Sequence, residues 1–211
     1  MFDKNFYPTP SDVARQMLSN CSHLFDRVGI AILEPSSGKG DLLNAIISKL
    51  KFRDSYGWMR NNRIYAIEKN PELHLLSSQI EGVSMLGYDF LSYNGGIYFD
   101  LIVMNPPFDK AEAHLLHAWN LLDNGEIVCL LNEESIDNPY SEDRKKLKHL
   151  IEQEGGRVQY LGACFKGAER RTNVNVVCVH FMKGTVHIEF LDEDVWAKFN
   201  QISAKGKNWI G

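Results

Sequence analysis

The stretch that decides the fold is IAILEPSSGKGDLL, residues 30–43. Its apolar start predicts a short buried strand, Ile30–Leu33, and the spacing of apolar residues over Asp41–Leu50 predicts a helix. Between the two, Gly38 and Gly40 let the backbone turn tightly and approach a ligand closely. The stretch therefore predicts one strand–turn–helix unit, with its glycine turn at the carboxyl end of the strand.

Strand-like apolar runs and amphipathic segments alternate along most of the chain. This alternation predicts an α/β fold of the Rossmann-like, doubly wound type, with a mostly parallel sheet and helices on both faces. The first helix is predicted to begin with Thr9 as N-cap and Pro10 at its first position. The other predicted helices are Asp41–Leu50, Pro71–Ile80, Ala111–Leu122 and Ser141–Glu154. The predicted strands are Ile30–Leu33, Arg63–Ile67, Val83–Leu86, Phe99–Met104, Glu126–Leu131, Arg157–Leu161 and Val174–Met182, and the chain closes with Thr185–Phe190 and a short helical tail.

The composition bounds the class of protein. With 211 residues, 44% of them hydrophobic and 24% charged, the chain is typical of a globular domain, and we predict that residues 1–211 form one domain. The apolar runs fall far short of a bilayer span, so no membrane association is predicted. Scattered cysteines without a CxxC pair and the lack of a signal sequence predict a cytoplasmic location and no metal site. The net charge of −4 means that any contact with nucleic acid depends on local basic clusters.

Acidic side chains follow the first three predicted strands, at the sheet edge where such folds bind ligands. Glu34 suits a cationic ligand and would repel phosphate; a leucine and a glycine also break the dinucleotide and phosphate-loop fingerprints here. Glu68 can accept from both hydroxyls of a ribose, and Asp89 with Phe90 can bind the amine and the face of a purine. Taken singly, an ordinary tight turn and a solvated strand end remain open alternatives.

The most specific signal is Asn105-Pro106-Pro107-Phe108, directly after the fourth predicted strand. The two prolines fix φ and remove two backbone donors, so the Pro106 carbonyl lacks a competing N–H from Pro107. Asn105 adds a side-chain acceptor, and Phe108 adds a flat apolar face. This set is typical of a site for an amino group on a planar ring, with a plain rigid turn as the alternative.

In this motif order, the sequence resembles the class I S-adenosylmethionine-dependent methyltransferases, and within them the adenine-N6 methyltransferases with an (N/D)PP(F/Y) motif, of phage or mobile-element type. The resemblance implies S-adenosyl-L-methionine as cofactor and an antiparallel last strand at Val174–Met182. The cofactor-binding residues that it implies are Tyr7, Thr9, Pro10, Glu34, Pro35, Ser36, Gly38, Gly40, Glu68, Lys69, Asp89, Phe90 and Asn105. The catalytic motif that it implies is Asn105, Pro106, Pro107 and Phe108, and Phe165 resembles the late aromatic residue that helps to hold a flipped base.

The acceptor implied by the resemblance is the N6 amine of adenine, in DNA rather than RNA. We expect Phe108 and Phe165 to bind the base, and Lys166, Arg170 and Arg171, which flank that pocket, to contact phosphates. The basic cluster Arg144–His149 is interpreted as a solvated helix face.

No segment has the size of a separate target-recognition domain, so we expect either little sequence specificity or a partner protein that supplies recognition. The histidines, His114 and His117 among them, are interpreted as surface or packing residues. Three alternatives remain: an RNA adenine acceptor, a protein-glutamine acceptor, and a non-catalytic partner subunit that keeps the methyltransferase fold.

Overall fold

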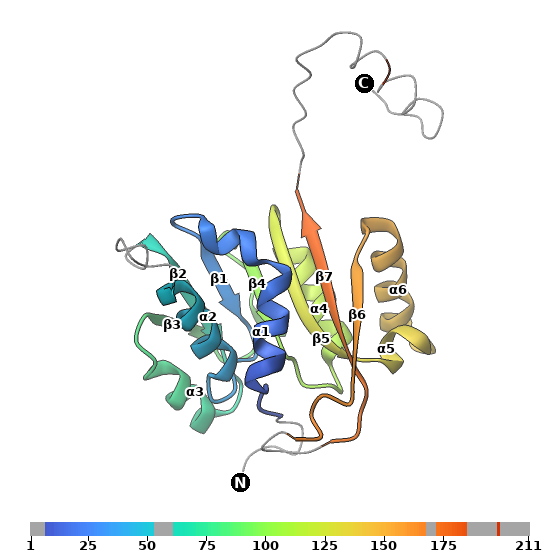
Figure 1. The fold of residues 1–211 in the computed structure, drawn as a ribbon, viewed down its shortest axis with the longest axis horizontal. Helices are drawn as coiled ribbons and strands as arrows, with labels where there is room; N and C mark the ends of the chain where they lie inside the picture. Colours follow the sequence, from blue (N-terminus) through green and yellow to red (C-terminus); the bar gives the residue numbers. More distant parts are fainter. Residues whose placement is uncertain (1–6, 53–60, 168–171, 185–197, 199–211) are drawn as a thin grey trace.

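The computed structural model describes residues 7–52, 61–167, 172–184 and Lys198 (Figure 1). A seven-stranded sheet forms its centre, in the order β3-β2-β1-β4-β5-β7-β6. The strands are β1 (Ala31–Glu34), β2 (Arg63–Ile67), β3 (Val83–Gly87), β4 (Leu101–Met104), β5 (Gly125–Asn132), β6 (Arg157–Gly162) and β7 (Val176–Lys183). The helices are α1 (Ser11–Asn20), α2 (Asp41–Phe52), α3 (Pro71–Ser78), α4 (Ala111–Leu121), α5 (Glu134–Asp137) and α6 (Glu142–Glu154), with short 3-10 turns η1 (Ser22–Asp26) and η3 (Phe90–Ser92).

The direction of the strands confirms the predicted topology. The pairs from β3 through β5 are parallel, whereas β7 runs antiparallel to both β5 and β6. The strand order reverses between β1 and β4, which is where doubly wound sheets bind ligands beyond the carboxyl ends of the strands. The segments after β1 and β4 therefore flank the switch point.

The central strands are buried on both faces, and their side chains alternate between two cores. In β4, Leu101 and Val103 pack with α1 and α2, whereas Ile102 and Met104 pack with α4. Strand β5 divides in the same way. Figure 1 shows α1 and α4 on opposite sides of the sheet. This two-sided burial explains why the strands read as nearly continuous apolar runs.

Local chemistry sets several helix ends. Asn70 caps α3 by accepting from the backbone N–H groups of Glu72 and Leu73, and a proline occupies the first turn. Ser141 caps α6, which ends at Gly155 in the left-handed conformation with φ of 67°. These signals fixed the predicted boundaries of both helices to within two residues.

Some predicted boundaries are wrong. Thr9 does not cap α1, because the helix starts at Ser11 after Pro10 and the Thr9 hydroxyl bonds elsewhere. Strand β4 starts at Leu101 rather than Phe99, whose ring instead packs edge-on against Tyr65. Strand β7 starts at residue 176, opposite the last residue of β5, and not at residue 174. The predicted Thr185–Phe190 strand and the helical tail lie outside the described residues, apart from residue 198.

Within the described residues, none of the helices is long and apolar enough to cross a membrane.

Candidate active site

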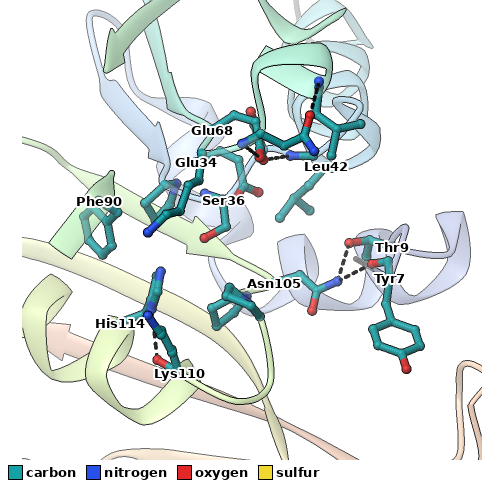
Figure 2. A pocket seen from close by; sticks show the side chains of 18 of the residues that line it. Tyr7, Thr9, Glu34, Ser36, Leu42, Glu68, Phe90, Asn105, Lys110 and His114 are labelled. Atoms are coloured by element: carbon teal, nitrogen blue, oxygen red, sulfur yellow. Dashed lines mark hydrogen bonds between the residues drawn. The ribbon is translucent and has the colours of Figure 1, made fainter. Parts of the chain in front are cut away.

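A cavity of about 430 Å³ opens beyond the carboxyl ends of β1, β2 and β4. Figure 2 shows Glu34, Ser36 and Glu68 above it, Phe90 and His114 on one side, and Asn105 with Tyr7 and Thr9 on the other. Most of the predicted site residues line this cavity together. They are Tyr7, Thr9, Glu34, Pro35, Ser36, Gly38, Glu68, Lys69, Asp89, Phe90, Asn105, Pro106, Pro107 and Phe108.

Glu68 holds the glycine turn in place. One of its carboxylate oxygens accepts from the Gly38 N–H at 2.7 Å, and the other accepts from the Asn70 N–H at 2.7 Å. The opposite side of the turn is bonded to Ser77 of α3, whose hydroxyl donates to the Gly38 carbonyl at 2.9 Å. Each Glu68 oxygen keeps a second acceptor position, so the carboxylate can still take hydroxyl donors from a ligand.

The two glycines of the turn have different roles. Gly38 lines the cavity, and its φ of 56° lies in the left-handed region. Gly40, with φ of 94°, does not line the cavity; a Cβ at this position would collide with Ile80 behind the turn. This contact gives Gly40 a packing role, and its binding of the cofactor stays a prediction.

Among the acids of the site, Glu34 has the most strongly shifted pKa. Its side chain is 1% exposed, and Ser36 N–H donates to one carboxylate oxygen at 3.0 Å. Burial, with the nearby charge of Glu68, raises the pKa of Glu34 to about 8. Because no described lysine or arginine forms an ion pair with it, a ligand cation in the cavity would be the counter-charge that favours its ionised form.

Phe90 forms an apolar wall on another side of the cavity and is almost fully buried. Asp89 beside it accepts from Leu91 N–H at 3.1 Å and pairs with Lys69 at 3.0 Å. The hydrogen bond from Lys69 lowers the pKa of Asp89, so this side chain is a carboxylate at neutral pH. The wall thus presents an apolar ring next to a charged acceptor.

The Asn105 side chain has one defined orientation. Its Nδ2 donates to the Tyr7 carbonyl and to the Thr9 hydroxyl, both at 3.0 Å. Because a carbonyl oxygen can only accept, the amide nitrogen must face Tyr7, and the amide oxygen is left as an acceptor on the other side. The hydroxyl that was expected to cap α1 therefore orients the motif asparagine instead.

Three aromatic rings from distant parts of the chain meet at the motif. Tyr7 stacks on Phe108 with ring centroids 5.7 Å apart and planes 20° apart. Phe165 packs edge-on against both rings, is 0% exposed, and lies behind the cavity lining. Phe165 therefore supports the rings that face the cavity. Its direct contact with a base stays a prediction.

The backbone after the motif forms a turn. The Lys110 N–H donates to the Pro107 carbonyl at 2.9 Å, whereas no described group donates to the Pro106 carbonyl. This pattern leaves the Pro106 carbonyl as an acceptor, as the two prolines predicted. The lining also includes His114 of α4, which was interpreted as an ordinary packing residue.

The residues predicted to contact phosphates and the basic cluster on α6 have different surroundings. Lys166 is exposed directly after Phe165, and Arg170 and Arg171 lie outside the described residues. In the cluster on α6, Arg144 bonds Glu112 at 2.8 Å, and the neighbouring lysines form i,i+3 pairs with acids of the same helix. Pro10 stands at the start of α1 and does not line the cavity.

Comparisons with known proteins bear on the fold of the chain. No protein-family model matches the chain. Over 102 residues it is 29% identical to the modification methylase CviBIII of Paramecium bursaria Chlorella virus NC1A; this covers 47% of the chain and a quarter, 25%, of the methylase's length.

Solved structures show the fold. A type I restriction-modification system methyltransferase subunit from Streptococcus thermophilus superposes with a TM-score of 0.66 at 17% identity, over 95% of this chain and 54% of that chain. A protein assigned as a class I S-adenosylmethionine-dependent methyltransferase from Listeria monocytogenes gives 0.68 at 14% identity, over 100% and 74%. A protein assigned as an RNA methyltransferase from Pyrococcus horikoshii gives 0.58 at 17% identity, over 85% and 88%.

The chain has the class I methyltransferase fold, and this fold with its relatives implies S-adenosyl-L-methionine as cofactor. The described residues fit that molecule at three points. A buried acid without a cationic partner, Glu34, suits a positive group; Glu68 suits a diol; and the wall at Phe90 suits a purine. The cavity also contains more carboxylates than lysines, in keeping with a cationic ligand.

Proposed function

We propose that this chain is an S-adenosylmethionine-dependent methyltransferase that methylates the exocyclic N6 amine of adenine in DNA. The observation that carries the proposal is the orientation of Asn105, whose amide nitrogen is bound by Tyr7 and Thr9 and whose oxygen is left to accept. Two of the relatives reported above, a viral modification methylase and a methyltransferase subunit of a restriction-modification system, favour DNA as the acceptor, whereas the Pyrococcus horikoshii protein keeps RNA as the alternative.

The chain's own residues would hold the cofactor as follows. Glu68 accepts from the ribose hydroxyls while it keeps its bond to the Gly38 N–H. Glu34 provides negative charge for the cationic part of the molecule, and Phe90 with Asp89 binds the adenine. When bound, S-adenosylmethionine supplies an electrophilic methyl group on a sulfonium.

The acceptor side has to make an aromatic amine nucleophilic. The lone pair of the adenine amine is delocalised into the ring, so the free amine is a poor nucleophile. Hydrogen bonds from its two N–H groups to the Asn105 oxygen and the Pro106 carbonyl would favour a pyramidal nitrogen with its lone pair directed at the methyl group. Once methylated, the amine would release one proton to solvent.

The target base has to leave a duplex to reach this site, or come from a single strand. Phe108 would stack on it, but Tyr7 now lies on that ring at 5.7 Å. A base between two rings needs about 7 Å, twice the optimal contact distance of carbon atoms. We therefore expect the Tyr7 ring to move aside when the base enters.

Recognition of a DNA sequence is expected to need help. We propose that residues 1–211 act as one catalytic domain and that a partner protein supplies target recognition. Among the described residues, the parts outside the sheet and its covering helices are single connections between elements, the 3-10 turns η1 and η3 and the four-residue helix α5. Connections of this length read few base pairs.

The test is methyl transfer from methyl-labelled S-adenosylmethionine to matched DNA, RNA and protein substrates. Mass analysis of the digested nucleosides should find N6-methyladenine in the DNA sample, and the Asn105→Ala variant should remove it. Label in RNA or on glutamine would keep the enzyme class and change the acceptor. No transfer, together with no binding of the cofactor, would contradict the proposal.

A further inference from the structure

The part of the cavity at Phe90 contains a histidine that the proposed mechanism does not use. His114 lies on α4, is 7% exposed and lines the cavity. Its ring is tilted against Phe90 with centroids 5.6 Å apart, while His117 contacts the edge of the same ring at 4.8 Å. Figure 2 shows His114 and Phe90 next to each other on the side away from Tyr7.

The hydrogen bonding of His114 fixes which ring nitrogen carries the proton. Nδ1 lies 2.9 Å from the Lys110 carbonyl oxygen, which can only accept, so Nδ1 must be the donor. Burial lowers the pKa of His114, so the ring is neutral at pH 7. The other nitrogen, Nε2, is then a bare acceptor; no described group bonds to it, and in Figure 2 it points into the cavity.

A second acceptor, the Asp89 carboxylate, lines the same cavity. The Asp89 carboxylate is near enough that its charge raises the pKa of His114, against the larger effect of burial. Asp89 and His114 therefore present two acceptors beside the apolar ring of Phe90. An exocyclic amine on a purine has two N–H donors and a flat face, and it complements this set. A 6-oxo purine would place an acceptor against these acceptors.

We propose that His114 Nε2 accepts a hydrogen bond from the exocyclic amine of the cofactor's adenine, and that this contact makes the site select 6-amino over 6-oxo purines. The inference rests on the proposed function, since it assumes that S-adenosylmethionine binds in this cavity. It adds a specificity-determining residue to the three acids and the phenylalanine already assigned. A buried acceptor left facing another acceptor weakens binding, which is how such selectivity arises.

The experiment compares two ligands that differ at one position. S-adenosylhomocysteine and S-inosylhomocysteine are titrated calorimetrically into the parent, His114→Phe, His114→Gln and His117→Phe. The parent should bind the adenosyl compound at least about tenfold more tightly. His114→Phe should lower this ratio at least about threefold, with Asp89 still present as an acceptor, whereas His114→Gln, which places an amide oxygen near the Nε2 position, should retain most of it.

His117→Phe is the matched control, because it changes a histidine of the same helix that also touches Phe90 but does not line the cavity. It should keep the parent ratio. A second measurement uses the parent protein alone: the ¹⁵N shift of His114 Nε2 should move when S-adenosylhomocysteine is added.

Three results would overturn the inference: equal affinities in the parent, a His114→Phe variant with the parent ratio, or an unmoved Nε2 shift. A parent that binds neither ligand contradicts the proposed function instead, so the two failures can be told apart.

Discussion

Two buried glutamates show how differently this molecule treats the same side chain. Glu34 is 1% exposed and receives one hydrogen bond from a backbone N–H, and burial raises its pKa to about 8. Glu112, 8% exposed, lies between α4 and α6. Burial alone would raise its pKa too, but hydrogen bonds from Ser135 at 2.7 Å and Arg144 at 2.8 Å outweigh it and lower the pKa.

The difference separates a region built for stability from a region built for a ligand. The Glu112 region contains its own counter-charge, and Arg144 also bonds the carbonyls of Glu134 and Asn138, so it joins α4, α5 and the start of α6. The Glu34 carboxylate has no described counter-charge. Its ionised form therefore lowers the stability of the folded chain, unless the carboxylate takes up a proton. We infer that the ligand cation completes the Glu34 region. Mutations in the two regions should therefore affect different measurements.

The largest effect is expected at the cavity, from Asn105→Ala. Methyl transfer should fall by roughly two to three decades, the scale of one lost oriented transition-state contact, while affinity for the cofactor stays near that of the parent. The measurement is single-turnover transfer together with calorimetric titration. Asn120→Ala, at an exposed position on α4, is the control. Parent-like turnover in Asn105→Ala would remove this residue from the chemistry.

A milder substitution tests whether the orientation of the Asn105 amide matters for turnover. Thr9→Val removes one of the two acceptors that orient the Asn105 amide and leaves the other in place. We expect a loss of turnover smaller than that of Asn105→Ala, with little change in cofactor affinity. A Thr9→Val loss as large as that of Asn105→Ala would mean that the hydroxyl does more than orient the amide.

The next largest effect is a loss of stability in the Glu112 region. Arg144→Ala leaves the Glu112 carboxylate buried without its cation and should lower the free energy of unfolding by roughly 3 kcal/mol, the low end for a broken buried pair. Denaturant unfolding measures this change. Cofactor affinity of the folded fraction should not change. Lys145→Ala, which removes only an exposed pair with Glu142, is the control and should cost far less.

Glu34→Gln should show the opposite pattern. It removes the negative charge from the cavity but keeps the size of the side chain and its hydrogen bonding to Ser36 N–H. We expect cofactor affinity to fall roughly ten- to hundredfold, the range for charged hydrogen bonds, with stability at pH 8 unchanged or raised. Loss of stability without loss of affinity would place Glu34 with Glu112 and abolish the contrast.

The same variant tests the pH dependence. The pKa of Glu34 is about 8 in the folded chain and 4.5 as its ordinary value, so between these values the folded state binds a proton that the unfolded state has released. This contribution to stability is complete below 4.5 and falls as pH rises through about 8.

A bound cation favours the carboxylate, so cofactor affinity should rise with pH up to the same point, by at most about one decade per unit. In Glu34→Gln, this pH dependence of cofactor affinity and the pH dependence of stability should both be absent. Measuring binding in buffers of different ionisation enthalpy should also detect the proton released by the parent. A parent with neither slope would contradict the raised pKa of this group.

Much of the fold could be predicted because its signals are local. A strand buried on both faces is an apolar run, and caps such as Asn70 and Ser141 lie next to the helices they start. The site followed from the fold, since parallel strands bring Glu34, Glu68 and Asn105 to one edge although they are far apart in sequence.

The errors concern side chains whose partners are distant in sequence. Thr9 has the right chemistry for a cap, but its hydroxyl is bonded to Asn105. His114 looked like a packing residue, because only the rotation of α4 decides that it faces the cavity. The pairing of Arg144 with Glu112 joins two helices that no sequence pattern connects. The sequence contains one indication for His114: it lies in the first turn of the helix that follows the motif, close to a site that needs acceptors.

The smallest expected effect compares one lysine from each region, if nucleic acid is the acceptor. Lys166 is exposed next to Phe165, which supports the proposed base pocket, whereas Lys145 pairs with Glu142 on α6 at 2.8 Å. Each phosphate that a lysine neutralises contributes about −0.9 to the slope of log affinity against log salt on duplex DNA, and about −0.7 on single strands. Lys166→Ala should therefore flatten the slope by a little under one unit, evenly across sequences, and Lys145→Ala should not change it. Fluorescence anisotropy over a salt series resolves this difference. Equal slopes in both variants would place the phosphate contacts elsewhere, with Arg170 and Arg171 as the next pair to replace.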